Sequence, residues 1–160
     1  MESVIPLPNG KVVLVDAGDL EMLSHWSWTC GVDCYVTAYN GGGLSGRRIV
    51  SMHRLLMLPA PGFHVDHVNH NKLDNRRANL RICTRSQNNM NQLRIPKNTS
   101  GFKGVSWSDP RRKWRARIKL DGRECQLGYF DDKADAARCY DSAARETFGE
   151  FALANFPQAN

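Results

Sequence analysis

The stretch VDHVNHNKLDNRRANLRICTRSQNNMNQ, residues 65–92, contains residue types that bind metals, protons and phosphates. An acid and an imidazole are adjacent at Asp66 and His67, and amides follow at Asn79 and Asn88. Such groups around one turn and one short helix could hold a divalent metal beside a general base. Four basic side chains are interspersed with them: Arg76, Arg77, Arg81 and Arg85. A metal, a base and phosphate-binding arginines together indicate phosphodiester cleavage.

The order of local structure predicted around these residues is strand, loop, strand, helix. Residues 65–68 and 80–82 are apolar enough for short strands, and residues 69–75 are rich in Asn, Asp and Lys, as loops are. Thr84 and Gln87 form a capping box, with Thr84 at the N-cap and Gln87 at N3. A helix therefore begins there and carries Asn88 in its first turns.

The first 64 residues are predicted to form a scaffold of short strands. Strands are expected at residues 11–15, 35–39 and 47–52, with a helix or turn at 16–24, a glycine-rich loop at 40–43 and a helical turn at 53–57 that Pro59 stops. Trp26 and Trp28, two residues apart, are expected on one side of a strand. Large apolar side chains here are interpreted as core.

The spacing of Asp66, His67, Asn79 and Asn88 resembles that of HNH endonucleases of the phage and homing type, over residues 50–92. The resemblance implies a strand–strand–helix metal finger. Asp66 and Asn88 would ligate one ion per chain, His67 would be the general base, and Asn79 would brace the loop that orients His67. Asn88 stands where the family name has a histidine, which favours Mg²⁺ or Mn²⁺ over zinc. The expected products are 5′-phosphate and 3′-hydroxyl ends.

Other interpretations stay open at several of these positions. His70 could be the base in place of His67, and Asn91, one helical turn past Asn88, could supplement or replace it as ligand. The four arginines could be a solvated face, although beside such a site we expect at least one to bind phosphate. Asp74 and Asn75 are interpreted as shaping the loop. His53 is interpreted as packing against the site or bracing it.

The C-terminal part is predicted to be a three-stranded antiparallel sheet packed on one helix. Strands are expected at residues 103–107, 113–120 and 124–129, with Asp121-Gly122 as a hairpin turn. Asp132 caps a helix that runs to about Phe148 and ends at Gly149. One helix face carries small and aromatic side chains that suit close packing on a sheet: Ala136, Ala137, Tyr140, Ala143, Ala144 and Phe148.

Motifs along residues 100–157, among them Gly104-Val105-Ser106-Trp107 and Leu127-Gly128-Tyr129-Phe130, resemble the APETALA-type DNA-binding domain of plant ethylene-response factors. The resemblance implies that the sheet enters the major groove of duplex DNA. Trp107, Arg115 and Arg117 would read bases, and four basic side chains would meet phosphates: Lys103, Arg111, Arg112 and Lys113. Lys103 and Ser106 replace arginines of the plant pattern, which puts the target sequence in doubt. A basic but idle sheet face is the alternative.

Composition agrees with a polyanion partner, because the 160 residues carry a net charge of +6 with a pI of about 9.3. The five cysteines show no framework spacing, so free thiols in a reducing compartment are expected; Cys30 and Cys34 as half of a zinc site is the alternative. The first residues lack the basic flank and apolar run of a signal peptide, so none is expected, and no transmembrane segment is expected either. An intracellular, cytoplasmic protein, possibly encoded by a phage and acting in its host, is expected.

The sequence thus predicts an α+β protein with a nuclease domain at residues 1–92, a linker at 93–100 and a DNA-binding domain at 101–160. It is expected to act on double-stranded DNA, without a membrane partner, as a monomer or dimer. One metal site per chain predicts nicking of one strand. The alternatives are a DNA-binding regulator with an inactive nuclease module, a structural zinc protein, and a nonspecific nuclease of DNA and RNA. Cutting should decline as pH falls through the pKa of His67.

Overall fold

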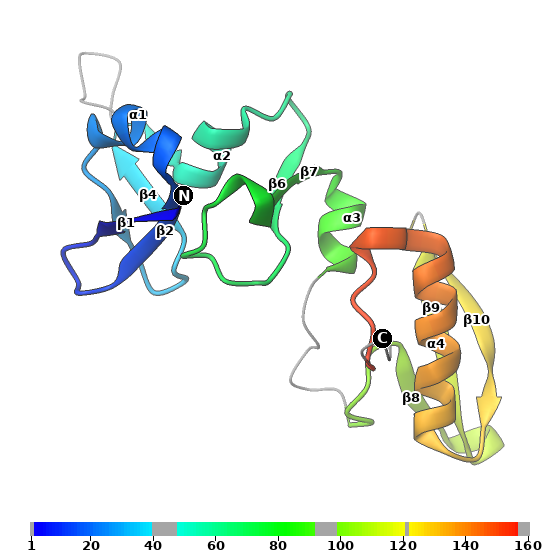
Figure 1. Ribbon diagram of the computed structural model, residues 1–160. Helices are drawn as coiled ribbons and strands as arrows, with labels where there is room; N and C mark the ends of the chain where they lie inside the picture. Colours follow the sequence, from blue (N-terminus) through cyan, green and yellow to red (C-terminus); the bar gives the residue numbers. More distant parts are fainter. Residues whose placement is uncertain (1, 40–47, 92–98, 121, 157–160) are drawn as a thin grey trace. The chain divides into compact units, whose positions relative to one another are not determined.

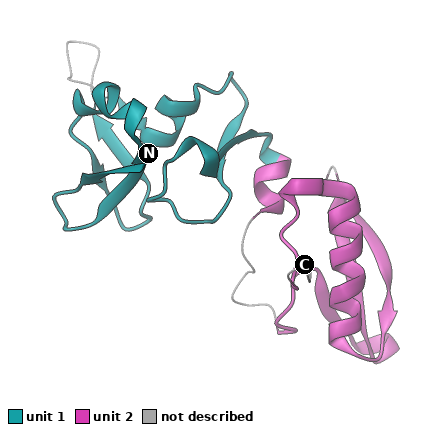
Figure 2. Ribbon diagram, in the orientation of Figure 1, with its two compact units in different colours: residues 1–85 teal, residues 86–160 magenta. Residues whose placement is uncertain are grey.

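The computed structural model describes residues 2–39, 48–91, 99–120 and 122–156. The chain divides into two compact units, Met1–Arg85 and Ser86–Asn160, called the N-terminal and C-terminal units below (Figure 2). Both contain helices and strands, as an α+β protein does. The functional boundaries at residues 92 and 101 stay predictions, and residues 93–98 of the expected linker lie outside the described residues, as does the loop expected at 40–43.

The N-terminal unit is built from short elements (Figure 1). In chain order they are β1 (Glu2–Pro6), β2 (Val12–Asp16), η1 (Ala17–Asp19), α1 (Leu20–Ser24), β3 (Thr29–Cys30), β4 (Val36–Tyr39), β5 (Ile49–Ser51), α2 (Met52–Met57), β6 (His64–His67), η2 (Arg77–Asn79) and β7 (Leu80–Cys83). The strands pair as the sheets β1-β2, β3-β4-β5 and β6-β7. The strands expected at residues 11–15, 35–39, 47–52, 65–68 and 80–82, the helix after β2 and the turn of helix before Pro59 are confirmed, with shifted ends, whereas β1 and β3 were not predicted.

One apolar core joins these small sheets. Alternation along β2 buries Val13 and Val15 completely, and they pack in one cluster with Leu23 and Met52. Because the sheets formed by the described residues of this unit have only two or three strands, this shared core, and not any single sheet, stabilises the unit.

The strand predicted around Trp26 and Trp28 is wrong. Both residues lie in an irregular segment between α1 and β3, with their ring centroids 5.8 Å apart. The indole N–H of Trp28 donates to the carbonyl of Leu23, 2.9 Å away, near the end of α1. A buried indole needs an acceptor, and a carbonyl at a helix end lacks an intrahelical partner, so this bond favours the irregular path. The prediction that these tryptophans belong to the core is confirmed.

Strands β6 and β7 form the antiparallel hairpin that carries the Asp-His pair, with Asp66 opposite Arg81 and His67 opposite Leu80. The loop between them is attached to β2, because Leu14 N–H donates to the Leu73 carbonyl and Asn75 N–H donates to the Leu14 carbonyl, each over 2.8 Å. The second half of the loop after His67 is therefore fixed to β2 by two backbone hydrogen bonds.

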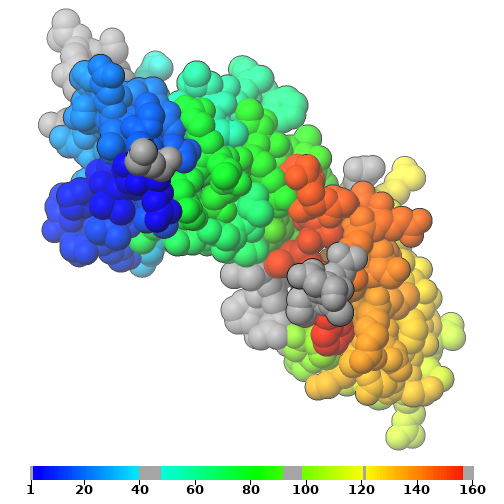
Figure 3. Space-filling view, viewed as in Figure 1, coloured from blue at the N-terminus to red at the C-terminus, as the bar shows by residue number. Residues whose placement is uncertain are grey.

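In the C-terminal unit a three-stranded antiparallel sheet packs on one long helix, as predicted (Figure 1). Its elements are α3 (Arg85–Met90), β8 (Val105–Ser108), η3 (Asp109–Arg111), β9 (Lys113–Leu120), β10 (Arg123–Phe130), α4 (Lys133–Phe148) and η4 (Gly149–Phe151), with β9 in the middle of the sheet. The outer side of α4 forms an open surface of this unit (orange in Figure 3).

Helix α4 begins and ends where its sequence predicts. The Asp132 side chain accepts hydrogen bonds from the backbone N–H groups of Ala134 and Asp135, and Gly149 follows the last turn with φ of 53°. The predicted face is the one that packs on the sheet: Ala136, Ala137, Tyr140 and Ala144 are buried, and Ala143 and Phe148 partly so.

Candidate active site

His67 ends β6 and is buried, with 5% of its surface exposed. Its ring lies 5.3 Å from the ring of His53, centroid to centroid, in an edge-to-face arrangement, and 6.2 Å from the ring of Tyr35. Lys72 lies over Tyr35, with its ammonium nitrogen 4.0 Å from the ring centroid. His53 therefore packs against the site, as predicted, while Tyr35 and Lys72 are neighbours that the sequence did not indicate.

Both imidazoles favour the neutral form. Burial, together with the charges of His67 and Arg54, lowers the pKa of His53 from 6.5 to about 4. Burial also lowers the pKa of His67, although an interaction with Asn75 and the carboxylate charges of Asp66 and Asp74 act in the opposite direction. A neutral His67 at neutral pH is what a general base requires.

Asp66 is buried and paired with Arg81 across the hairpin. The Arg81 Nε and Nη2 atoms donate to Asp66 Oδ2 over 3.0 and 2.8 Å. The two side chains expose only 11% and 10% of their surface. Because both partners come from strands in fixed register, the carboxylate is held in one place beside His67.

Asn79 connects the two ends of the loop that follows His67. Its Oδ1 accepts from the backbone N–H of Asn69 over 3.0 Å, and its Nδ2 donates to the carbonyl of Asp74 over 2.8 Å. Asp74 is buried, and the guanidinium of Arg76 holds its pKa below the usual value. Asp74 and the buried Asn75 thus shape the loop, as the sequence predicted.

The predicted phosphate-binding arginines of the N-terminal unit contact carboxylates. Arg76 pairs with Asp74 and Glu2, and Arg77 pairs with Asp19, over 2.7 to 2.8 Å. Their side chains are 35% and 50% exposed, so both guanidinium groups also reach solvent. Arg81 is the buried partner of Asp66 and has a supporting position.

The remaining predicted residues lie on or beside α3. Arg85, the first residue of α3, is exposed, and Asn88 lies in its middle. Asn91 follows the helix, is buried, and donates its backbone N–H to the Gln87 carbonyl over 3.3 Å. This helix falls mainly in the C-terminal unit, so the convergence of Asn88 with Asp66 and His67 stays a prediction.

Within the described residues no three His, Cys, Asp or Glu side chains gather as a metal-binding group. The predicted ligand set is smaller, with one carboxylate and one amide, and leaves other coordination positions to water and phosphate oxygens.

All five cysteines are free thiols, as expected, and Cys30 and Cys34 contact Asn9 and Lys11. No helix in the described ranges has the length and hydrophobicity needed to cross a bilayer.

Comparison with known proteins assigns this site to a family. A model described as HNH endonuclease matches residues 57–90, which contain the β6–β7 hairpin, Asn79 and Asn88. An uncharacterized HNH endonuclease, L560, of Acanthamoeba polyphaga mimivirus is 27% identical over 146 residues, 91% of this chain and 75% of that protein. Protein 3.8 of Escherichia phage T7 is 33% identical over 107 residues, 66% of this chain and 88% of the phage protein. The chain belongs to the HNH endonucleases.

This HNH endonuclease is thus a nuclease, a hydrolase, with relatives in viruses. A different likeness concerns a shorter part of the chain. Ethylene-responsive transcription factor ERF084 of Arabidopsis thaliana is 42% identical over 65 residues, which are 39% of this chain and 25% of the plant protein.

The predicted DNA-reading side chains of the HNH endonuclease lie on or beside β8 and β9. Arg117 pairs with Glu124 over 2.6 Å, and Arg115 lies 3.9 Å from the same carboxylate. The sequence analysis did not identify Glu124 as a neighbour of these arginines. Their proximity follows from the hairpin register, in which Glu124 is opposite Lys119, two residues from Arg117. Both arginines are partly exposed, at 31% and 40%.

The other predicted DNA contacts differ in their surroundings. Trp107 is 43% exposed and packs edge-on against Trp114, 5.1 Å between centroids. Arg111 stacks over Tyr129, and Lys113 pairs with Asp131. Arg112 is exposed and has a left-handed backbone, with φ of 49°. Lys103 is half-buried, and burial lowers its pKa from 10.5 to about 8.

The low pKa of His53 predicts a stability that depends on pH. The unfolded chain protonates His53 near pH 6.5, whereas the folded unit does so only near pH 4, so stability is present above pH 6.5 and is lost progressively as pH falls toward 4. Between pH 7.5 and 5 the free energy of unfolding should fall by about 2 kcal/mol from this group. Urea unfolding at several pH values measures it. His53→Gln should remove this dependence, whereas the same change at the exposed His25 should retain it.

Proposed function

We propose that the protein is a metal-dependent HNH endonuclease of the homing type that nicks duplex DNA through His67. The observation that carries this proposal is the position of His67 inside the HNH segment: buried, favouring the neutral form, next to a fixed Asp66, and followed by a loop that Asn79 ties together. A buried neutral imidazole can accept a proton from a water molecule that attacks a phosphodiester. The products would carry 5′-phosphate and 3′-hydroxyl ends.

Asp66 and Asn88 would hold one Mg²⁺ or Mn²⁺ ion. Their donor atoms are a carboxylate and a carboxamide oxygen, which suit a hard cation. Arg81 fixes the carboxylate, so this donor needs no reorganisation before binding. When bound, the ion would stabilise negative charge on the scissile phosphate and on the departing 3′ oxygen.

Positive side chains near the site would orient the DNA strand. The exposed Arg85 and the partly exposed Arg76 and Arg77 would contact phosphates. Arg81 would act through Asp66, because its guanidinium is buried against that carboxylate. Since each chain has one such site, a monomer would cut one strand, and cleavage of both strands would need two chains.

Supercoiled plasmid DNA tests the activity. With Mg²⁺ or Mn²⁺ the full chain should convert it to the relaxed form, and end analysis should find 5′-phosphates. Absence of nicking with every divalent ion, together with tight duplex binding, would instead favour the regulator with an inactive nuclease module. Equal cutting of an RNA duplex would favour a nonspecific nuclease.

We further propose that the C-terminal sheet binds duplex DNA, with Arg115 and Arg117 reading bases and nearby basic side chains meeting phosphates. The support is a pair of partly exposed arginines on the middle strand, both beside one carboxylate that limits their orientations. Oriented guanidinium groups can form two hydrogen bonds to a guanine edge. The viral relatives support a further part of the proposal, that the enzyme is encoded by a virus and acts inside the infected host cell.

Replacement of Arg117 by alanine should weaken binding to the preferred sequence by about 5- to 100-fold, the range expected for one lost base contact. Binding to random duplex should change far less. Arg138→Ala is the matched control, since Arg138 is an exposed arginine on α4, away from the sheet strands, where it pairs with Asp135 and lies over the ring of Phe156. Fluorescence anisotropy with both duplexes measures the effect, and an equal loss on both would mean that Arg117 contacts phosphate.

A further inference from the structure

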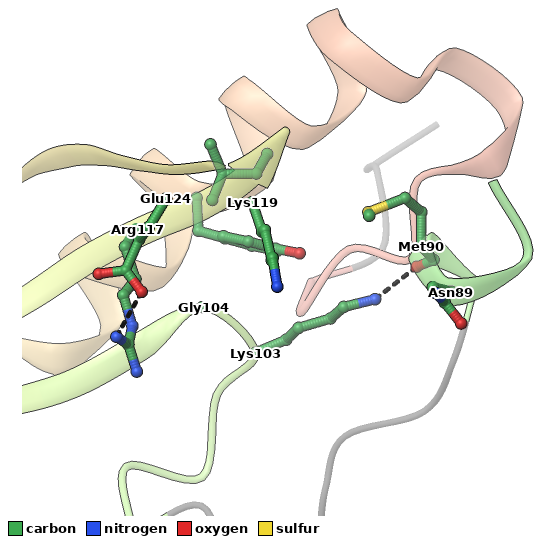
Figure 4. A pocket seen from close by; sticks show the side chains of 9 residues that line it. Asn89, Met90, Lys103, Gly104, Arg117, Lys119 and Glu124 are labelled. Atoms are coloured by element: carbon green, nitrogen blue, oxygen red, sulfur yellow. Dashed lines mark hydrogen bonds and ion pairs between the residues drawn. The ribbon is translucent and has the colours of Figure 1, made fainter. Parts of the chain in front are cut away.

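Lys103 extends toward α3 and contacts its last residue. Its ammonium group donates a hydrogen bond to the backbone carbonyl of Met90, as Figure 4 shows. The last carbonyls of a helix have no intrahelical partner, and a cation at this end also complements the helix dipole. Helix α3 has only six residues, far fewer than a helix needs to be stable alone, so it depends on such contacts.

The backbone of Lys103 is anchored to the rest of the C-terminal unit. Its N–H donates to Asn155 Oδ1 over 2.6 Å, and its carbonyl accepts from Asn155 Nδ2 over 3.1 Å. The same Asn155 donates to the buried carboxylate of Asp141 on α4 over 2.7 and 2.9 Å. A chain of hydrogen bonds therefore runs from α4 to Lys103 and on to the end of α3.

The residue after Lys103 packs directly against α4, with no room for a side chain. Gly104 has φ of +75°, and a Cβ atom there would lie 2.0 Å from Cδ2 of Tyr140. The side chain of Lys103 borders a cavity of about 280 Å³ that Asn89, Met90 and Tyr140 also line. Lys103 is thus held at a fixed point, with its stem half-buried and its charge on the α3 carbonyl.

We propose that Lys103 is a positioning residue that docks α3, and with it Asn88, on the C-terminal unit. This rests on the proposed function of Asn88 as a metal ligand. It gives Lys103 a task different from the phosphate contact that the family resemblance implies. The C-terminal module would then supply DNA binding and also the support for one ligand of the nuclease site.

Amide hydrogen exchange in the full chain without divalent ions tests the docking directly. Lys103→Met, which keeps the stem and removes the charge, should speed exchange at residues 88–91 by about tenfold, and Lys103→Arg should restore slow exchange. Lys119→Met is the matched control. Lys119 is exposed and lines the same cavity, and its replacement by methionine removes the same charge. Unchanged exchange in Lys103→Met would overturn the proposal.

Measurements of nicking and of duplex binding distinguish a positioning role of Lys103 from a contact between Lys103 and a DNA phosphate. Lys103→Met should raise the Mg²⁺ concentration for half-maximal nicking by about tenfold and leave duplex affinity in EDTA within about threefold of the unaltered protein. A weakened duplex affinity with a smaller salt dependence and normal exchange would assign Lys103 to phosphate and overturn the proposal.

Asn88→Ala distinguishes failure of this inference from failure of the proposed function. If Asn88→Ala leaves the Mg²⁺ dependence unaltered, Asn88 is no ligand and the proposed function is wrong at that residue. If Asn88→Ala changes that dependence but Lys103→Met does not, only the positioning role of Lys103 is wrong.

Discussion

Replacement of His67 by alanine is expected to lower the nicking rate by about 10²- to 10⁴-fold, the contribution of a general base. The imidazole is buried, directly follows Asp66 in the chain and packs edge-on against the ring of His53. The rate of relaxation of supercoiled plasmid at saturating Mg²⁺ measures the loss. Duplex affinity in EDTA should stay unchanged, because His67 acts on water and not on DNA.

His70→Ala is the informative control, because His70 lies three residues away in the same loop and was the competing candidate. Its backbone is left-handed, with φ of 62°, and its N–H donates to the His67 carbonyl over 3.0 Å. We expect less than about a tenfold loss, from a disturbed loop alone. If His70→Ala lost nicking and His67→Ala retained it, His70 would be the general base and His67 would not.

Local patterns predicted much of the fold because they depend on neighbours in sequence. The α4 cap at Asp132, the glycine after its last turn and the alanine face each follow from spacing along one helix. The β6–β7 hairpin follows in the same way, and its register places Asp66 opposite Arg81. The candidate site was predictable to the extent that its residues come from this hairpin and its loop.

Partners distant in sequence were not predictable in this way. Arg76 and Arg77 have the composition of a phosphate-binding patch, yet their carboxylate partners include Glu2 and Asp19, which are 74 and 58 residues away. Tyr35, the residue before β4, reaches the His67 ring from a distant part of the chain. Nothing in the spacing of such residues marks their contact, because it arises only when separate small sheets share one core.

Replacement of Gly104 by alanine is expected to destabilise the C-terminal unit by about 4 kcal/mol, the sum of a left-handed backbone and a steric clash. The φ of +75° disfavours any side chain, and the added Cβ would lie 2.0 to 2.7 Å from three ring atoms of Tyr140. The ring cannot move away easily, because Tyr140 is buried between Ile118 and Ala144. Amide exchange along β9 in the full chain measures the stability of this unit.

Gly122→Ala separates the clash from the backbone effect. Gly122 has nearly the same φ, +82°, but nothing lies within 4 Å of an added Cβ, so only about 1 kcal/mol should be lost. Because Lys103 is adjacent to Gly104, the alanine at 104 should also release α3, whereas the alanine at 122 should not. Equal stability of the two variants would mean that the Tyr140 ring can move aside, and that the close contact between Gly104 and Tyr140 does not fix the position of Lys103.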